Sequence, residues 1–463
     1  MKLSKLLVLS IIPTVLCSCV AKNSSSTQPS SSQEEEEVYE CYANAHMMSM
    51  VNSKKEMTGY TATFHYKDDF FDGSATAYSN DIKLISFASS LVTEKKNYAD
   101  AFFTKLQFET VAYGGYEEIT EDTIGYYIAH KSLKNYDLLA VSIRGFEYEK
   151  EWANNCILGA EGNHKGFDDR ANELLTTLKP IMATYTSKPL KLWVSGFSRA
   201  GAVANLLAHK MLTSNDLSVN KESLFVYTYE APGCIAAENA VAYENVFNHI
   251  NDIDIVAALP PAEYGLTRCG VNVIINKDKN IDQALLAFDS EAVLPAFTPS
   301  TEAPVFANEK EFIDYFYAGL LKDYITDPET LPDITIATRA DYVKNLQPHL
   351  SYAIGFFMSL PNTTVNKIKN KISSLSGFEY IALLSEDGLY DLIKPILDED
   401  GIPYDGETLR AHLNGLVKIV ASKLNFLIDF IDTSTYGIKE SMKNNILRVG
   451  YMHSPEVVYS LIK

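Results

Sequence analysis

The sequence lacks the patterns of a metalloprotein, because it has no CxxC pair and no cysteine–histidine cluster at the spacing of zinc ligands. Positive charge is also scarce, with 40 lysine and arginine residues against 59 aspartate and glutamate residues and a formal net charge of -19. Binding to a nucleic acid backbone requires a basic surface, so this balance argues against a nucleic-acid partner. No nucleotide or flavin motif is present, and we expect neither a cofactor nor a metal.

Long apolar runs are missing beyond the N-terminus, and no later segment is predicted to span a membrane. Two lysines precede an apolar stretch at residues 6–16, which is too short to cross a bilayer and is typical of a secretory signal. The tetrapeptide LCSC at residues 16–19 resembles a bacterial lipobox, so we expect Cys19 to carry a lipid. An ordinary signal peptide cut near Ala21 is the alternative. The predicted location is extracytoplasmic, with the protein anchored to the cell membrane.

The chain divides into segments of different character. Residues 1–18 are predicted to be the lipoprotein signal peptide, and residues 19–56 a disordered tether, because serine-rich and acidic runs offer little to bury. Residues 57–275 and 446–463 are predicted to form the catalytic core, with residues 276–445 as a helical insertion or cap. Disulfides are possible among four cysteines that the sequence does not pair: Cys41, Cys156, Cys234 and Cys269.

Within the predicted core, apolar strand patterns alternate with helical patterns. Strands are predicted at residues 138–143, 192–195, 224–229 and 246–250, and helices at residues 167–178 and 202–212. This alternation predicts an α/β fold with a mostly parallel central sheet wrapped by helices. Later in the chain, apolar residues recur at helical spacing over residues 409–431, which predicts a long amphipathic helix inside the insertion.

The candidate nucleophile is Ser198, in the pentapeptide Gly-Phe-Ser-Arg-Ala at residues 196–200. An apolar strand leads into the pentapeptide and a helical segment leads out, which suits a nucleophile on a sharp strand-to-helix turn. The small residues Gly196 and Ala200 allow the backbone to turn and the helix to pack closely. An idle serine in a glycine-bounded turn is the alternative.

Four blocks of sequence, in order, resemble the class 3 lipase family, to which fungal triacylglycerol lipases belong. The blocks are residues 140–145 with Trp152, residues 164–167, the pentapeptide around Ser198, and residues 229–233 with residues 251–261. The third block departs at three positions from the family's usual Gly-His-Ser-Leu-Gly-Gly. The resemblance, which covers residues 60–274, implies an α/β-hydrolase fold and a serine hydrolase that acts on lipid or acylglycerol esters.

A catalytic serine needs a base to accept its proton and a carboxylate to orient that base. The resemblance implies that the carboxylate is Asp254, because Asp-Ile-Val followed by Leu-Pro-Pro is where the family's aspartate falls. Asp252 is the neighbouring alternative, and a carboxylate solvated in a turn is its simpler interpretation.

The base should follow the aspartate in the chain, which leaves three histidines. His412 flanks the apolar stripe of the long predicted helix and is expected to be structural. His349 lies in a Pro-His-Leu-Ser-Tyr segment that resembles fungal family members, whereas His453 lies in a segment that resembles bacterial relatives. We favour His453, because Ser454 and Pro455 predict that a helix begins directly after it.

Two backbone N–H groups should bind the oxyanion of the tetrahedral intermediate. One belongs to Arg199, which follows the nucleophile, and the resemblance implies Phe146 for the other. The family usually has serine or threonine where this chain has Phe146, so any contribution from a side-chain hydroxyl is lost.

These predictions describe an esterase or lipase that acts through an acyl-enzyme intermediate, with an ester or lipid substrate and a membrane anchor as its partners. Peptidase, thioesterase and acyltransferase chemistry use the same groups, so the triad does not choose among them. The alternative is a non-catalytic surface lipoprotein that uses the hydrolase scaffold as a binding module. Phe146 and the altered pentapeptide favour that alternative.

Overall fold

The computed structural model describes residues 38–44, 59–120, 122–146, 149–288, 338–375, 383, 385–428 and 451–463. The predicted signal peptide, Cys19 and most of the predicted tether lie outside these residues. None of the described helices combines the length and the apolar character needed to cross a membrane. The four cysteines of the described residues, Cys41, Cys156, Cys234 and Cys269, are free thiols.

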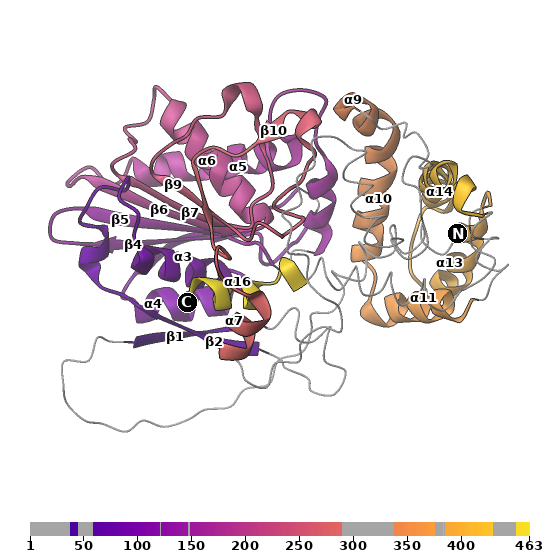
Figure 1. The fold of residues 1–463 in the computed structure, drawn as a ribbon, viewed down its shortest axis with the longest axis horizontal. Coiled ribbons are helices and arrows are strands. Elements are labelled where there is room, and N and C mark those ends of the chain that lie inside the picture. The colour runs from indigo at the N-terminus through magenta and orange to yellow at the C-terminus, as the bar shows by residue number, and fades with distance from the viewer. Residues whose placement is uncertain are drawn as a thin grey trace.

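Seven strands form the central sheet in the order β11-β9-β7-β6-β5-β4-β3 (Figure 1). Their bounds are β3 Glu109–Gly114, β4 Tyr126–Ser132, β5 Asp137–Ile143, β6 Leu190–Phe197, β7 Leu224–Tyr229, β9 Val246–Ile250 and β11 Val271–Ile274. The strands from β5 to β11 run parallel, whereas β4 and β3 are antiparallel at one edge. Strands β5, β7 and β9 are buried along their whole length, as expected for parallel strands with both faces covered.

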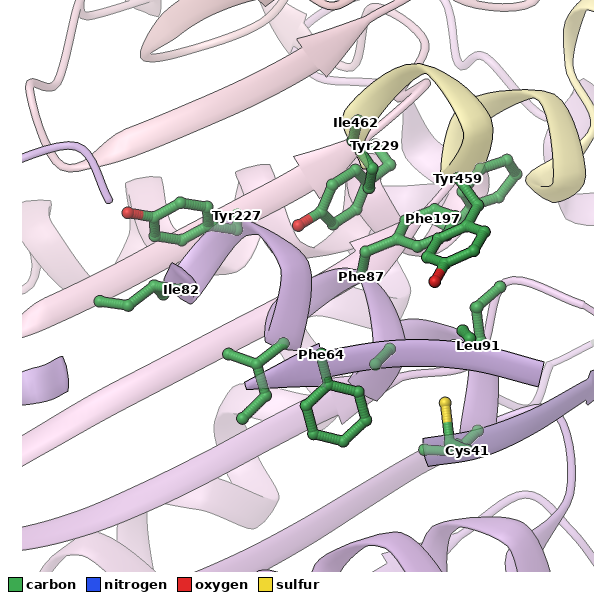
Figure 2. Close-up of a cluster of buried hydrophobic side chains, with 14 of the residues drawn as sticks. Cys41, Phe64, Ile82, Phe87, Leu91, Phe197, Tyr227, Tyr229, Tyr459 and Ile462 are labelled. Atoms are coloured by element: carbon green, nitrogen blue, oxygen red, sulfur yellow. The ribbon is translucent and has the colours of Figure 1, made fainter. Parts of the chain in front are cut away.

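Helices cover both faces of the sheet (Figure 1). One face carries α5 (Lys165–Met182) and α6 (Arg199–Thr213), and the other carries α3 (Asn80–Val92) and α4 (Lys96–Lys105). The C-terminal helix α16 (Pro455–Ile462) packs on the α3 side through aromatic rings, where Phe87 stacks on Tyr459 at 6.2 Å and contacts Tyr229 at 4.9 Å (Figure 2). The last residues of the chain therefore belong to the core of the sheet unit.

Two boundaries differ from the sequence prediction. Strand β1 (Val38–Asn44) pairs antiparallel with β2 (Gly59–His65), so the predicted disordered tether at residues 19–56 contains an ordered strand. Alternate side chains of β1, Cys41 and Ala43, are buried in the core, a pattern too short to stand out beside the acidic run before it. Helix α7 (Ile281–Phe288), predicted as part of the insertion, packs against α16 and belongs to the sheet unit.

A second, helical unit has its own apolar core. Its elements are α9 Arg339–Asp341, η6 Tyr342–Leu346, α10 Gln347–Met358, α11 Asn362–Ser374, α13 Gly388–Glu399 and α14 Gly406–Ile428. Helix α14 is the long amphipathic helix predicted over residues 409–431. The guanidinium of Arg339 joins this unit to the sheet unit by donating to the carbonyl oxygens of Leu158, Gly159 and Gly162 at 2.5–2.8 Å.

The shorter elements lie in the connections of the sheet unit. They are η1 Asp68–Phe71, η2 Glu149–Cys156, β8 Ile235–Ala236, η3 Ala237–Asn239, η4 Ala262–Tyr264 and β10 Leu266–Thr267. Helix α10 packs against η2, which follows the end of β5. A mostly parallel sheet with helices on both faces, and a helical unit inserted before the final helix, is the α/β-hydrolase fold that the sequence predicted.

Candidate active site

Ser198 stands on a strained turn between β6 and α6. Its backbone has φ 56° and ψ -125°, a conformation that L-residues with a side chain rarely adopt. Gly196 makes the turn possible, because a Cβ at this position would lie 2.4 Å from the carbonyl oxygen of Ala200. The Ser198 amide donates to the carbonyl oxygen of Tyr229 in β7 at 2.8 Å, which ties the turn to the sheet. The sharp bend predicted from the sequence is present.

Three side chains that the sequence singled out meet at this turn. Nε2 of His453 lies 2.7 Å from Oγ of Ser198, and Nδ1 of His453 lies 2.6 Å from Oδ2 of Asp254. With Nδ1–H donating to the carboxylate, Nε2 is left as the acceptor that faces the hydroxyl. This is the arrangement in which an imidazole takes a proton from a serine while a carboxylate holds the ring in place.

Local structure orients both partners of Ser198. Asp254 follows β9 and is buried, and its second carboxylate oxygen accepts the amide of Val256 at 2.9 Å. His453 precedes α16, whose N-cap is Ser454, with Oγ accepting the amide of Val457 at 3.3 Å. The helix start predicted from Ser454 and Pro455 is confirmed. The imidazole also contacts the ring of Phe197, with 5.3 Å between centroids.

The alternative residues do not join this cluster. Nδ1 of His349 in α10 lies 3.2 Å from Nδ1 of His412 in α14, so these two histidines pair with each other inside the helical unit. Asp252 lies in the turn after β9, where its carboxylate accepts the side-chain amide of Asn276 at 2.6 Å. Neither His349 nor Asp252 has a hydrogen bond to Ser198 or His453 among the contacts of the described residues.

The two predicted oxyanion donors flank the turn. Arg199 is the first residue of α6, and the amides of a first helical turn point out of the helix end. Phe146 follows the end of β5 and its ring stacks on Phe197 at 4.6 Å. Gly145 is needed between them, because a Cβ there would lie 2.2 Å from the carbonyl oxygen of Phe197. The loop after β5 and the turn after β6 are therefore in backbone contact.

A buried ion network that includes Arg199 was not predicted from the sequence. Glu151 of η2 bridges the guanidinium groups of Arg144, at the end of β5, and Arg199. All three side chains are at most 2% exposed, and Thr123 donates to the same carboxylate at 3.0 Å. The only signal in the sequence is that Glu151 directly precedes Trp152 in the first lipase-like block.

A second missed residue is Glu230, which directly follows β7. It is fully buried, has φ 49°, and accepts the amide of Asn251 at 2.8 Å. Burial and the negative charge of Asp254 raise the pKa of Glu230 well above its ordinary value. Glu230 lies in the block at residues 229–233, but the sequence did not predict a buried role for it, because a glutamate after a strand is usually exposed.

Glu230, Asp254 and His453 form the one cluster in the described part of the chain whose ligand atoms lie close enough together, within 4.8 Å, for a metal ion. Both ring nitrogens of His453 are already engaged by Ser198 and Asp254. A cation would have to displace one of these partners, so the cluster fits proton transfer better than metal binding.

Comparison with known proteins finds one family match and several partly similar solved structures. The family model "Lipase (class 3)" matches residues 140–264, which include Phe146, Ser198 and Asp254. No curated protein matches the chain. Among solved structures, the triacylglyceride lipase of Rhizomucor miehei has 20% identity and a TM-score of 0.34, over 44% of this chain and 83% of that one.

Two further solved structures are similar over part of the chain. Lipase II from Rhizopus niveus has 16% identity and a TM-score of 0.33, over 42% of this chain and 81% of that one. M37 lipase has 12% identity and a TM-score of 0.30, over 70% of this chain and 99% of that one. The family match shows similarity to the class 3 lipases over residues 140–264, and the sheet and its helices have the α/β-hydrolase fold.

Proposed function

We propose that this protein is a serine hydrolase that cleaves carboxylic esters, with Ser198 as nucleophile, His453 as general base and Asp254 as the orienting carboxylate. The observation that carries the proposal is the continuous hydrogen-bonded chain from Ser198 through His453 to Asp254, at 2.7 and 2.6 Å. Lipid or acylglycerol esters are the proposed substrates, and the class 3 lipase match over residues 140–264 is their support.

In the proposed reaction, Oγ of Ser198 attacks the ester carbonyl carbon while Nε2 of His453 accepts the hydroxyl proton. The negative charge that develops on the carbonyl oxygen is stabilised by the backbone N–H groups of Phe146 and Arg199. Collapse of the tetrahedral intermediate breaks the C–O bond, and the leaving alcohol takes the proton from His453. Water, deprotonated by the same imidazole, then attacks the carbonyl carbon of the acyl-enzyme. The bond between this carbon and Oγ of Ser198 breaks, Oγ takes the proton from His453, and the carboxylic acid is released.

A fluorophosphonate probe, which forms a covalent bond with an activated serine, tests this function. We expect the wild type to be labelled and Ser198→Ala to be unlabelled. Ser187→Ala, at an exposed serine in the loop before β6, is the matched control and should be labelled like the wild type. A folded wild type that resists the probe would contradict the hydrolase proposal and leave the non-catalytic binding module as the better account.

We also propose that the protein is an extracytoplasmic lipoprotein anchored to the cell membrane through Cys19. The support is the sequence alone: a short apolar stretch at residues 6–16, followed by the lipobox-like LCSC at residues 16–19. Metabolic labelling with a fatty acid analogue should mark the wild type and Cys17→Ala, but not Cys19→Ala. Retention of the lipid in Cys19→Ala would contradict this anchor.

A further inference from the structure

The carboxyl group of Glu230 lies beside the acid of the proposed triad. One carboxylate oxygen of Glu230, one of Asp254 and a ring nitrogen of His453 all lie within 4.8 Å of one another. Glu230 is 0% exposed and Asp254 is 1% exposed, so water does not screen the two carboxyl groups. Two negative charges at this separation in a dry interior repel each other strongly, and one of the pair is expected to hold a proton.

The hydrogen bonds indicate which of the two holds the proton. Both oxygens of Asp254 accept donors, from His453 Nδ1 at 2.6 Å and from the Val256 amide at 2.9 Å. In Glu230, Oε1 accepts the Asn251 amide, but no donor among the described residues reaches Oε2. A buried carboxylate oxygen without a donor is costly, whereas a protonated oxygen in the same place is itself a donor.

The other charged group near Glu230 does not change this assignment. Arg268 is close enough for its charge to favour ionisation of Glu230. Its guanidinium is directed to the backbone, however, and donates to the carbonyl oxygens of Ala231 and Ala257 at 2.6 Å each. Burial and the charge of Asp254 outweigh it, and the pKa of Glu230 lies well above the ordinary value.

Glu230 also connects the end of β7 to the segments that carry Asp254 and His453. Its backbone amide donates to the carbonyl oxygen of His249 in β9, and its side chain accepts the amide of Asn251 directly after that strand. The side chain of Asn251 then donates to the carbonyl oxygen of Met452 at 3.0 Å, next to His453. The segments that bear Asp254 and His453 are thus joined through Glu230 and Asn251.

We propose that Glu230 is a positioning residue of the triad: a neutral carboxylic acid whose proton is directed at Asp254, so that this carboxylate stays ionised and aligned with His453. This inference rests on the function proposed above. Glu230 neither touches the substrate nor exchanges a proton in the reaction. It donates a hydrogen bond to the carboxylate of Asp254. Through Asn251, it also holds the loop before α16 in position.

The test follows the titration of the His453 imidazole by NMR in full-length protein with labelled histidine, a readout that does not depend on turnover. The variants are Glu230→Gln, which keeps a neutral donor and the acceptor for Asn251, and Glu230→Met, which keeps the length and removes both. Glu244→Gln, at an exposed glutamate paired with Lys221, is the control for loss of a distant charge. The His453 signal is assigned by its loss in His453→Asn.

We expect the midpoint of His453 in Glu230→Gln to stay within ~0.3 pH units of the wild type, because one neutral donor replaces another. In Glu230→Met the midpoint should rise, since Asp254 loses a donor and attracts the imidazolium more strongly. Labelling by the fluorophosphonate probe should slow by ~10-fold to 100-fold in that variant, the scale of a misplaced catalytic group.

Two results would overturn the proposal. A fall of ~1 unit or more in Glu230→Gln would mean that the wild-type residue is a charged carboxylate, because removing a nearby negative charge lowers the pKa of a histidine by that much. An unchanged midpoint in Glu230→Met would mean that the residue only fills space. If Glu230→Met does not fold, the result with Glu230→Gln still decides the protonation state. Failure of the hydrolase proposal is seen separately, as absence of wild-type labelling.

Discussion

The Nε2 atom of His453 lies 2.7 Å from the Oγ atom of Ser198, although 255 positions separate the two residues along the chain. The distance depends on the packing of α16 against α3, because His453 occupies the loop directly before α16. The proposed base is therefore held by the hydrophobic core of the sheet unit and is not part of the helical insertion.

The first prediction separates the two histidines that the sequence left open. His453→Ala should lower kcat/KM for an ester substrate by at least ~10³-fold, because the base that accepts the serine proton is removed. His349→Ala should leave kcat/KM close to the wild-type value, since its ring pairs with His412. Hydrolysis of a chromogenic short-chain ester measures both. The reverse pattern would overturn the assignment of the base.

A second prediction concerns the carboxylate. Asp254→Asn should lower kcat by ~10⁴-fold, because the amide no longer holds the imidazole in the reactive tautomer. Asp252→Asn is the matched control two positions away, and its main partner is the side chain of Asn276. Equal losses in the two variants would show that Asp254 has no special role.

The third prediction concerns the buried ion network of Arg144, Glu151 and Arg199. Glu151→Gln removes the carboxylate that the buried side chains of Arg144 and Arg199 share, and the free energy of unfolding should fall by ~3–5 kcal/mol. Asp398→Asn removes one partner of an exposed pair with Lys394 and, as the control, should leave the free energy of unfolding close to that of the wild type. Urea unfolding measures both variants. A similar small loss in Glu151→Gln would show that the network is not needed for stability.

A fourth prediction concerns acid stability. Burial lowers the pKa of His249 to about 3, so the folded protein keeps this ring neutral while the unfolded chain protonates it near the ordinary value of 6.5. Above pH 6.5 the ring is neutral in both states and the pKa difference has no effect on stability. As the pH falls from 6.5 toward 3, only the unfolded chain binds the proton, and the folded protein is progressively destabilised. The loss should be about 1.4 kcal/mol per pH unit for this histidine.

Urea midpoints between about pH 7 and pH 5 measure this effect, in a range chosen to limit the contribution of carboxyl groups. His249→Phe cannot titrate, and its unfolding free energy should fall less steeply with acid than that of the wild type. His164, whose pKa burial also lowers to about 3, remains in the variant and accounts for part of the residual slope. Identical slopes in the two proteins would contradict the prediction.

Much of the sheet unit was predictable from local sequence. Buried parallel strands form uninterrupted apolar runs, so β5, β6, β7 and β9 were found close to their observed bounds. The turn at Ser198 was also predictable from local sequence, because a strand, a pentapeptide with small residues and a helix follow one another directly in the chain. The short strand β1 was missed, since its partner β2 is separated from it by an intervening segment and its pattern spans only seven residues.

By itself, the sequence determined the elements whose partners are near in the chain: the strands, the helix starts and the identities of Ser198 and Asp254 as candidates. Only the tertiary structure placed His453, and not His349, within hydrogen-bond distance of Ser198, and only it brought Glu151 to Arg199 and Glu230 to Asp254. The physical reason is that a titratable side chain acquires its role from the charges and donors around it. Those neighbours come from distant segments of the chain, so the local pattern of residues does not predict them.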